Sequence, residues 1–303
     1  MKTTQDPKSA KPRRNRVGPL GYVTGGVRIR GNIEMVIGGG IVLLFVIVSV
    51  VVEIAQLLHI QITPYNPLQQ NVGPVLSPPS LNHLFGTDQF GRDLFSRIIA
   101  ATPYGFSIGF MVVGVAMVVG IAVGCFAGFR GGLFDEALMR TTDVFFAIPA
   151  LILAIAIVAR LGPGLLTITL ALIIVWWPAY ARLSRGETLK IAHQNYIEAS
   201  RTSGFGTVRI VIHHVIPNIF LTLIVYATLD LGTVVLFYAG LSYLGLSIPP
   251  PAPDWGYMVS SYQDYLVSAP FLPLIPGLTI AVAAIGFALF GDGFRDALEE
   301  GSS

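Results

Sequence analysis

The chain has 303 residues, of which 53% are apolar and only 12% are charged, against about 25% charged residues in soluble domains. This composition excludes a single water-soluble globule and indicates a membrane protein. The formal net charge of +2 and the single cysteine carry no information about partners, disulfides or metal sites. Apolar runs without ten-residue alternation predict spanning helices rather than spanning strands.

The first thirty residues are rich in Lys and Arg. They predict a cytoplasmic basic tail beside anionic lipid, in preference to an arm that binds nucleic acid. A cleaved signal peptide is not expected, because the first apolar run is long and no small-residue cleavage site follows it.

Six apolar runs are each long enough, or nearly so, to cross a hydrocarbon core of roughly 30 Å. They are 35–52, a run within 104–129, the short run 144–159, then 165–181, 219–238 and 274–290. With both termini in the cytoplasm, all of the 19 Lys and Arg residues except Arg92, Arg97 and Arg160 lie inside. Both ends are therefore predicted to be cytoplasmic.

These runs divide the chain into four parts. Residues 1–30 form the basic tail, and 31–103 hold the first transmembrane helix and an extracellular insert. Residues 104–298 form a core of five transmembrane helices with a cytoplasmic loop at 190–217, and 299–303 form a C-terminal tail. We expect one membrane domain, and no internal repeat is visible.

The insert ends in a block that contains Asp88, Arg92 and Asp93 just before the second apolar run. These side chains are close enough to pair and to cap the helix that feeds the second span. No nucleophile or histidine stands at a compelling spacing with the two carboxylates. We therefore expect a structural role and no catalytic residue here.

A polar segment separates the fourth and fifth apolar runs. Asn195 and Glu198 have capping-box spacing for a short helix, and a sharp turn at 203–206 follows. Thr207 can then open a second helix that ends before Pro217. The segment therefore predicts a helix-turn-helix on the membrane surface, which is typical of a docking element.

Asp230 is an ionisable residue within an apolar run, and such a group normally faces a partner or a water-filled path. Two interpretations stay open: Asp230 lines a translocation path, or it makes a pair or hydrogen bond that stabilises a subunit interface. The adjacent His213 and His214 lie on different faces of a helix and are poor joint metal ligands. No phosphate-binding loop is present, so another chain must hydrolyse any nucleotide.

The polar segment resembles the loop by which membrane subunits of ABC importers grip their ATPase subunits. That loop has a Glu-Ala-Ala pattern, a Gly about five residues later, then Ile and a final Pro; here Ser200 replaces the second Ala. The matching positions are Glu198, Ala199, Ser200, Gly204, Ile210 and Pro217.

Three further blocks resemble the C-type permease subunits of oligopeptide, dipeptide and nickel importers, in the order and spacing of that family. They are 83–97, with its Gly-Thr-Asp, Gly-Arg-Asp and Ser-Arg; 241–256, with Leu-Ser-Tyr-Leu-Gly-Leu and Asp-Trp-Gly; and the tail 291–298. Tyr243 replaces the usual Phe. Tyr238 stands where the family often carries Glu. The resemblance covers roughly residues 30–298.

The resemblance implies an all-α type I ABC importer permease fold with six transmembrane helices, in the cell membrane of a prokaryote. It implies a pore shared with a homologous B-type permease subunit, two ATP-binding subunits and an extracytoplasmic solute-binding protein. No cofactor or metal is expected in this chain, because ATP and Mg would bind the ATPase subunits.

Two sites are expected. Asp230, from its place in an apolar run, and Tyr238, from its place in the family's pattern, are candidates for the translocation path. The resemblance makes Asp254, Trp255 and Tyr257 candidates for docking of the binding protein. Short peptides are the first expectation for the substrate, then oligosaccharides, then nickel. A secondary transporter or channel that works without ATP would keep the six spans but has no use for the paired-helix loop. An intramembrane enzyme would need paired polar groups within its spans, and Asp230 alone does not provide them.

Overall fold

The computed structural model describes residues 33–300, and the side chains of residues 33–298. Helices make up most of this part of the chain, and it contains no β-strand beyond one isolated bridge between Thr87 and Asp93. The expected all-α fold is therefore confirmed. The basic tail at 1–30 and the last three residues lie outside the described part.

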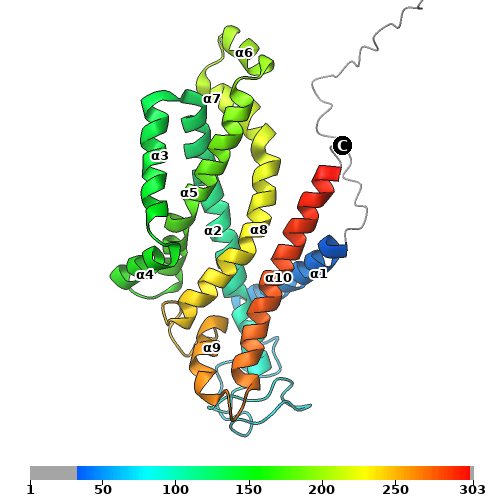
Figure 1. The fold of residues 1–303 in the computed structure, drawn as a ribbon. Helices are drawn as coiled ribbons and strands as arrows, with labels where there is room; N and C mark the ends of the chain where they lie inside the picture. The colour runs from blue at the N-terminus through cyan, green and yellow to red at the C-terminus, as the bar shows by residue number, and fades with distance from the viewer. Residues whose placement is uncertain (1–32, 301–303) are drawn as a thin grey trace, which may run out of the picture.

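Ten α-helices follow one another along the described chain, and Figure 1 shows their arrangement. They are α1 (Ile33–Leu57), α2 (Leu94–Arg130), α3 (Gly132–Ala147), α4 (Ala150–Leu161), α5 (Leu165–Ala192), α6 (Asn195–Thr202), α7 (Thr207–Ile210), α8 (Ile216–Tyr243), α9 (Trp255–Tyr262) and α10 (Phe271–Glu300). A π-helical segment (Val211–Val215) joins α7 to α8, and a 3₁₀ turn (Gln263–Tyr265) follows α9. In Figure 1, α6 lies at one end of the molecule and α9 with the insert near the other.

Five helical stretches are long and apolar enough to cross a membrane: α1, α2, α5, the continuous Thr207–Tyr243 and α10. They coincide with five of the six predicted spans. The second begins at Leu94, ten residues before the expected boundary, so one helix connects the insert directly to the membrane core.

The third predicted span, 144–159, is wrong as a single helix. Helices α3 and α4 meet there at an angle of 87°, and only when this bent pair counts as one span does the described chain hold six. Ile148 has an extended backbone, with φ −104° and ψ 129°. It precedes Pro149, and a residue before proline is disfavoured in the helical conformation. Figure 1 shows α3 running beside α5 and α4 lying across the end of this pair.

Helices α2 and α5 pack closely along a stripe of small residues. Gly120, Gly124 and Gly128 recur every fourth residue on α2, and a Cβ atom at Gly120 or Gly124 would collide with the backbone of α5. Because the two helices are so close, the Ser184 hydroxyl of α5 donates to the Gly120 carbonyl at 2.8 Å. Small residues that let backbones approach are the usual basis of helix association in lipid.

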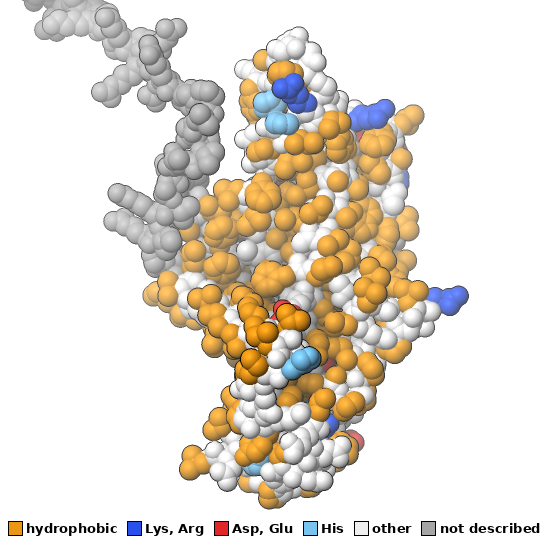
Figure 2. Space-filling view, turned by 180° about the vertical axis from the view of Figure 1, so that it is seen from behind, with side chains coloured by type: hydrophobic (Ala, Val, Ile, Leu, Met, Phe, Trp, Pro, Cys, Tyr) orange, Lys and Arg blue, Asp and Glu red, His pale blue; other side chains and the backbone are white. Residues whose placement is uncertain are grey.

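Aromatic side chains fill the core where α1, α2, α9 and α10 meet. Phe106 stacks on Phe45 with ring centroids 5.2 Å apart and packs against Phe287 at 5.3 Å. The indole of Trp255 donates to the Ile98 carbonyl at 3.0 Å, which fixes α9 to α2. The surface outside this core is largely apolar, and Figure 2 shows hydrophobic side chains over most of the middle of one face. Such a surface fits lipid or another membrane subunit.

Candidate functional site

Helices α6 and α7 form the turn that the sequence predicted, and they project from the end of α5 (Figure 1). We call residues 194–217 the coupling segment. Ile197 and Ile210 are buried and join an apolar cluster with Phe129 of α2, which holds the segment on the body. Glu198 and Ala199 are exposed. Gly204 is also exposed and has φ +83°, a conformation that other residues adopt only with strain, so the predicted glycine turn is confirmed.

The predicted capping box of this segment is wrong. Gln194 rather than Asn195 is the N-cap residue of α6, and no side chain caps this end. Ser200 turns toward its own chain: it is buried, and its hydroxyl donates to the Tyr196 carbonyl at 2.8 Å. Its small size allows α6 to lie close to the body.

The second helix of the segment does not end before Pro217. It continues through the π-helical segment into α8, where proline occupies one of the first positions. Proline lacks a backbone N–H, and the first turn of a helix is where this loss is tolerated. Because the wider π-turn precedes it, the chain can begin α8 at Ile216 without leaving the helical path.

The exposed surface of the coupling segment combines aromatic, aliphatic and basic side chains. Tyr196, Phe205 and Val208 are 44%, 39% and 56% exposed. The guanidinium of Arg209 lies over the Phe205 ring at 4.6 Å from its centroid, and that of Arg201 over Phe129 at 4.3 Å. Exposed aromatic and Arg side chains are the types enriched at protein interfaces.

Asp230 is half-buried on α8 and has a partner that the sequence did not indicate. The hydroxyl of Tyr180 on α5 donates to its Oδ2 at 3.0 Å. Tyr180 in turn packs edge-on against Tyr226, one turn before Asp230 on α8, with centroids 5.2 Å apart. The contact joins residues fifty positions apart, so no local spacing could have revealed it.

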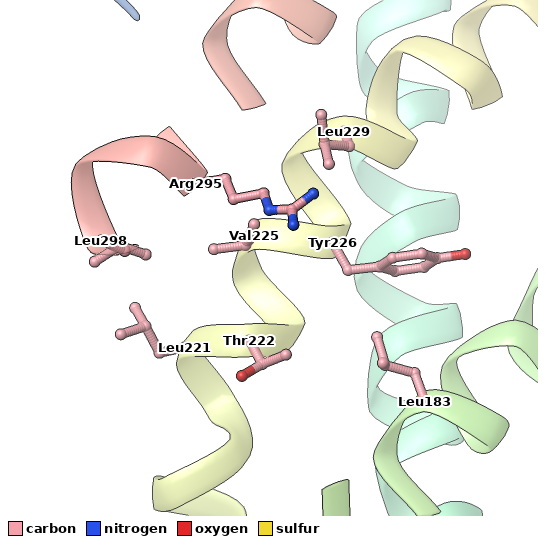
Figure 3. A pocket seen from close by; sticks show the side chains of 8 residues that line it. All are labelled: Leu183, Leu221, Thr222, Val225, Tyr226, Leu229, Arg295 and Leu298. Carbon is pink, nitrogen blue, oxygen red and sulfur yellow. The ribbon is translucent and has the colours of Figure 1, made fainter. Parts of the chain in front are cut away.

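A cavity of about 410 Å³ opens beside this group, between α5, α8 and α10 (Figure 3). It is lined by Leu183, Leu221, Thr222, Val225, Tyr226, Leu229, Arg295 and Leu298. Figure 3 shows the Arg295 guanidinium extending from α10 toward α8. The walls are therefore mostly aliphatic, with a hydroxyl, a phenol and one cation among them.

Tyr238, a second path candidate, lies elsewhere. It is 4% exposed, and its hydroxyl donates to the carboxylate of Asp254, which also accepts from Ser242 and Ser247. Asp254 caps α9 by accepting from the Gly256 N–H at 3.0 Å. The prediction that Tyr238 lines the path is contradicted, because its side chain is enclosed within the chain.

The same burial corrects the predicted docking site for a binding protein. Asp254 and Trp255 are only 1% and 4% exposed and hold α9 in place, so they offer no surface to a partner. Tyr257 is partly exposed and is the one of the three that remains accessible.

Asp88 lies at the centre of a buried polar network at the opposite end from the coupling segment. It is fully buried, and its carboxylate accepts from Arg92 Nε at 2.6 Å and from the N–H groups of Phe90 and Arg92. Tyr262 of α9 donates to the same carboxylate at 3.1 Å. Burial, with Asp88 nearby, raises the pKa of Tyr262 to about 12.

Asp93 is the N-cap of α2, as predicted. Its Oδ2 accepts from the Ser96 N–H at 2.8 Å, and its Oδ1 lies 2.9 Å from Nδ1 of His83. The sequence shows no histidine at a compelling spacing with this carboxylate, since His83 and Asp93 are ten positions apart and meet only through the fold of the insert. Among the described side chains, no three His, Cys, Asp or Glu residues are placed to hold a metal ion.

Comparison with known families identifies the fold and the kind of protein. Residues 120–302, more than half of the chain, match the family described as "Binding-protein-dependent transport system inner membrane component". The chain belongs to this family. It is therefore a multi-pass transport component of the inner membrane, and ABC importer permeases of this kind work with ATPase partners.

Relatives of this transport family share much of the length of the chain. The di/tripeptide transport system permease protein DppC of Pseudomonas aeruginosa is 41% identical over 244 residues, which cover 78% of this chain and 80% of the relative. The probable D,D-dipeptide transport system permease protein DdpC of Escherichia coli is 37% identical over 257 residues, covering 84% and 86%. A solved inward-facing structure of the MetNI methionine ABC transporter aligns with TM-score 0.53 and 23% identity, over 67% of this chain and 95% of that chain. This last likeness shows the fold alone.

Proposed function

We propose that this chain is the membrane-spanning permease subunit of an ATP-driven importer of short peptides. The observation that carries the proposal is the exposed coupling segment, with its Glu198-Ala199 pair and the positive-φ turn at Gly204, in a chain of this transport family. Peptides are proposed over oligosaccharides and nickel, because relatives that are 41% and 37% identical carry di/tripeptide and D,D-dipeptide names.

The proposed assembly contains a homologous B-type permease subunit, two ATP-binding subunits and an extracytoplasmic binding protein. ATP and Mg would bind only the ATPase subunits, which would dock on the coupling segment. Both termini would be cytoplasmic, and the buried network around Asp88 would face outward. Tyr257 is the accessible candidate for contact with the binding protein.

Transport in this scheme is a switch between two states of the pore, and nucleotide drives the switch only if it favours one of them. The coupling segment follows α5 directly, and the glycine stripe ties α5 to α2. A displacement of the segment would therefore move both helices together. In this proposal, Asp230, which accepts a hydrogen bond from Tyr180, lines the translocation path. The cavity beside Tyr226 is this chain's part of that path.

The function is tested by reconstituting the chain with its partner subunits in vesicles and measuring dipeptide uptake, ATPase activity and subunit retention together. Glu198→Arg reverses an exposed charge without touching lipid. We expect normal insertion but a loss of ATPase retention or of its stimulation by loaded binding protein. Uptake that needs no ATP, and that persists without the ATPase subunits, would support the secondary transporter or channel instead.

The path assignment has a separate test. Asp230→Asn keeps the shape of the side chain and the acceptor for Tyr180 while removing the charge. A change in uptake rate or selectivity per assembled complex supports a path residue. Poor assembly with normal uptake per complex would assign Asp230 to a subunit interface.

Topology is tested by labelling introduced cysteines with a reagent that cannot cross the membrane. The native Cys125 is buried, so its background is low. Gln70→Cys should react from outside and Lys190→Cys only after the membrane is opened. The reverse pattern would contradict the proposed orientation.

A further inference from the structure

Glu53 is a carboxylate near the end of the apolar helix α1, and it lies against α2. The hydroxyl of Ser107 donates to its Oε1 at 2.7 Å. A groove of about 200 Å³ opens at this contact, lined by Val46, Ser49, Val50, Glu53, Phe106, Ser107 and Phe110. The groove therefore combines one acid and two hydroxyls with apolar walls.

The position of Ser107 along α2 places the groove at a membrane boundary. Ser107 lies 23 residues before Arg130, the last residue of α2. At 1.5 Å per residue this is about 35 Å, slightly more than a hydrocarbon core of roughly 30 Å. With Arg130 at one membrane boundary, this length would bring the groove to the other. Val50 and Phe110, each 47% exposed, form an apolar rim of the kind that contacts lipid.

Glu53 has no basic partner in the described part of the chain. None of the ion pairs there includes it, and Ser107 is a neutral donor. The Glu53 side chain is exposed, so a cation can reach it. A cation stabilises a carboxylate that lies among apolar side chains at the edge of the membrane. No basic side chain of the described residues is placed to do so.

We propose that this groove binds the primary ammonium headgroup of a phospholipid, as in phosphatidylethanolamine. Its ammonium carries three N–H donors and can bond the Glu53 carboxylate directly, with the Ser49 and Ser107 hydroxyls beside it. Phe106, Phe110 and the valines would lie against the first part of an acyl chain. A quaternary ammonium, as in phosphatidylcholine, carries no N–H and cannot make this bond.

The proposal is tested on the purified complex by native mass spectrometry with short-chain phosphatidylethanolamine and phosphatidylcholine that have identical acyl chains. A charge pair at a partly exposed site contributes up to about 1 kcal/mol, which corresponds to a preference of about five-fold. We expect that preference for the wild type and close to none for Glu53→Gln. Glu34→Gln, which removes an exposed carboxylate in the first turn of α1, should leave the preference unchanged.

Two results would overturn the proposal. An equal preference for phosphatidylethanolamine in the wild type and in Glu53→Gln would show that the carboxylate does not recognise the headgroup. Loss of the partner permease from Glu53→Gln, with lipid preference unchanged, would assign the groove to a basic side chain of that subunit. If Glu53→Gln does not fold, Ser107→Ala tests the same contact, since it frees the carboxylate and should lower the preference without removing it.

Discussion

At the end of the molecule that holds α9 and the insert, charged side chains are buried and bind one another, whereas at the other end the coupling segment leaves its charged side chains exposed. Asp88 and Arg97 are 0% and 2% exposed, while Glu198 and Arg201 lie on the surface. Buried charges must find partners within the chain, so the first end is fixed when the chain folds. The second end leaves its charged side chains to water and, in the proposed assembly, to the ATPase subunits.

The largest effect is expected from Asp88→Ala. This change leaves Arg92 and Arg97 buried beside each other without a counter-charge, and such a loss destabilises by about 3–5 kcal/mol. Thermal unfolding of the purified protein measures it. Glu198→Ala, on the exposed end, should change stability by no more than about 0.5 kcal/mol. Similar losses of stability for the two variants would contradict the difference between the two ends.

Gly124→Ala tests how firmly the coupling segment is tied to the body through α5. The added methyl group would collide with the Ala181 carbonyl, and such overpacking costs about 1–3 kcal/mol. Gly114→Ala is the matched control, because a Cβ there meets nothing within 4 Å. We expect lower unfolding temperature and weaker ATPase coupling only for the first variant. Equal behaviour would mean that α2 and α5 separate easily.

Gly204→Ala should strain the coupling segment by about 1–2 kcal/mol, because an L-residue is disfavoured at φ +83°. The strain falls on the coupling segment, so ATPase coupling should fall, and the unfolding temperature should fall by less than for Gly124→Ala. Gly206→Ala is the control, since its φ of −69° suits any residue and its Cβ also meets open space. Loss of coupling in both variants would point to side-chain contact with a partner rather than to backbone geometry.

The smallest effect is expected from Tyr262→Phe, which removes one donor to Asp88 and costs about 1 kcal/mol at neutral pH. The pKa of Tyr262 rises from 10.0 to about 12 on folding. Its contribution is therefore fully present below pH 10 and is lost as pH rises toward 12. Unfolding followed across this range should show a steeper loss for the wild type than for Tyr262→Phe. If stability falls equally steeply with pH in both proteins, the Tyr262 phenol is as hydrated in the folded protein as in the unfolded one.

The sequence predicted the features that depend on neighbours along the chain. Five spans follow from continuous apolar runs, the turn at Gly204 from its need for positive φ, and the helix cap at Asp93 from its place before an apolar helix. The bend at Pro149 could not be predicted in the same way. Three other prolines, Pro103, Pro178 and Pro276, lie inside long helices, so proline alone does not mark a break.

Contacts between distant segments account for the other errors. Tyr238 is a path candidate because it stands where the resembled permeases often carry Glu, yet its hydroxyl is buried against Asp254, sixteen residues later across a loop. The partner of Asp230 is on another helix, and that of Asp93 comes from an irregular loop. No periodicity connects such positions, since three-dimensional packing alone decides which of them meet.

The π-helical segment Val211–Val215 joins α7 of the coupling segment to α8. A π-turn holds one residue more than an α-turn needs, so deleting a single residue there would let the hydrogen-bonded helix close without a gap. An α-helix rotates by about 100° per residue, and the wider π-turn rotates by less, so the extra residue is absorbed within one turn. Deleting one residue inside the π-helical segment should therefore leave the face of α8 that carries Asp230 at nearly the same angle to the coupling segment. Deleting one residue inside α8, between Val215 and Asp230, would instead rotate that face by about 100°.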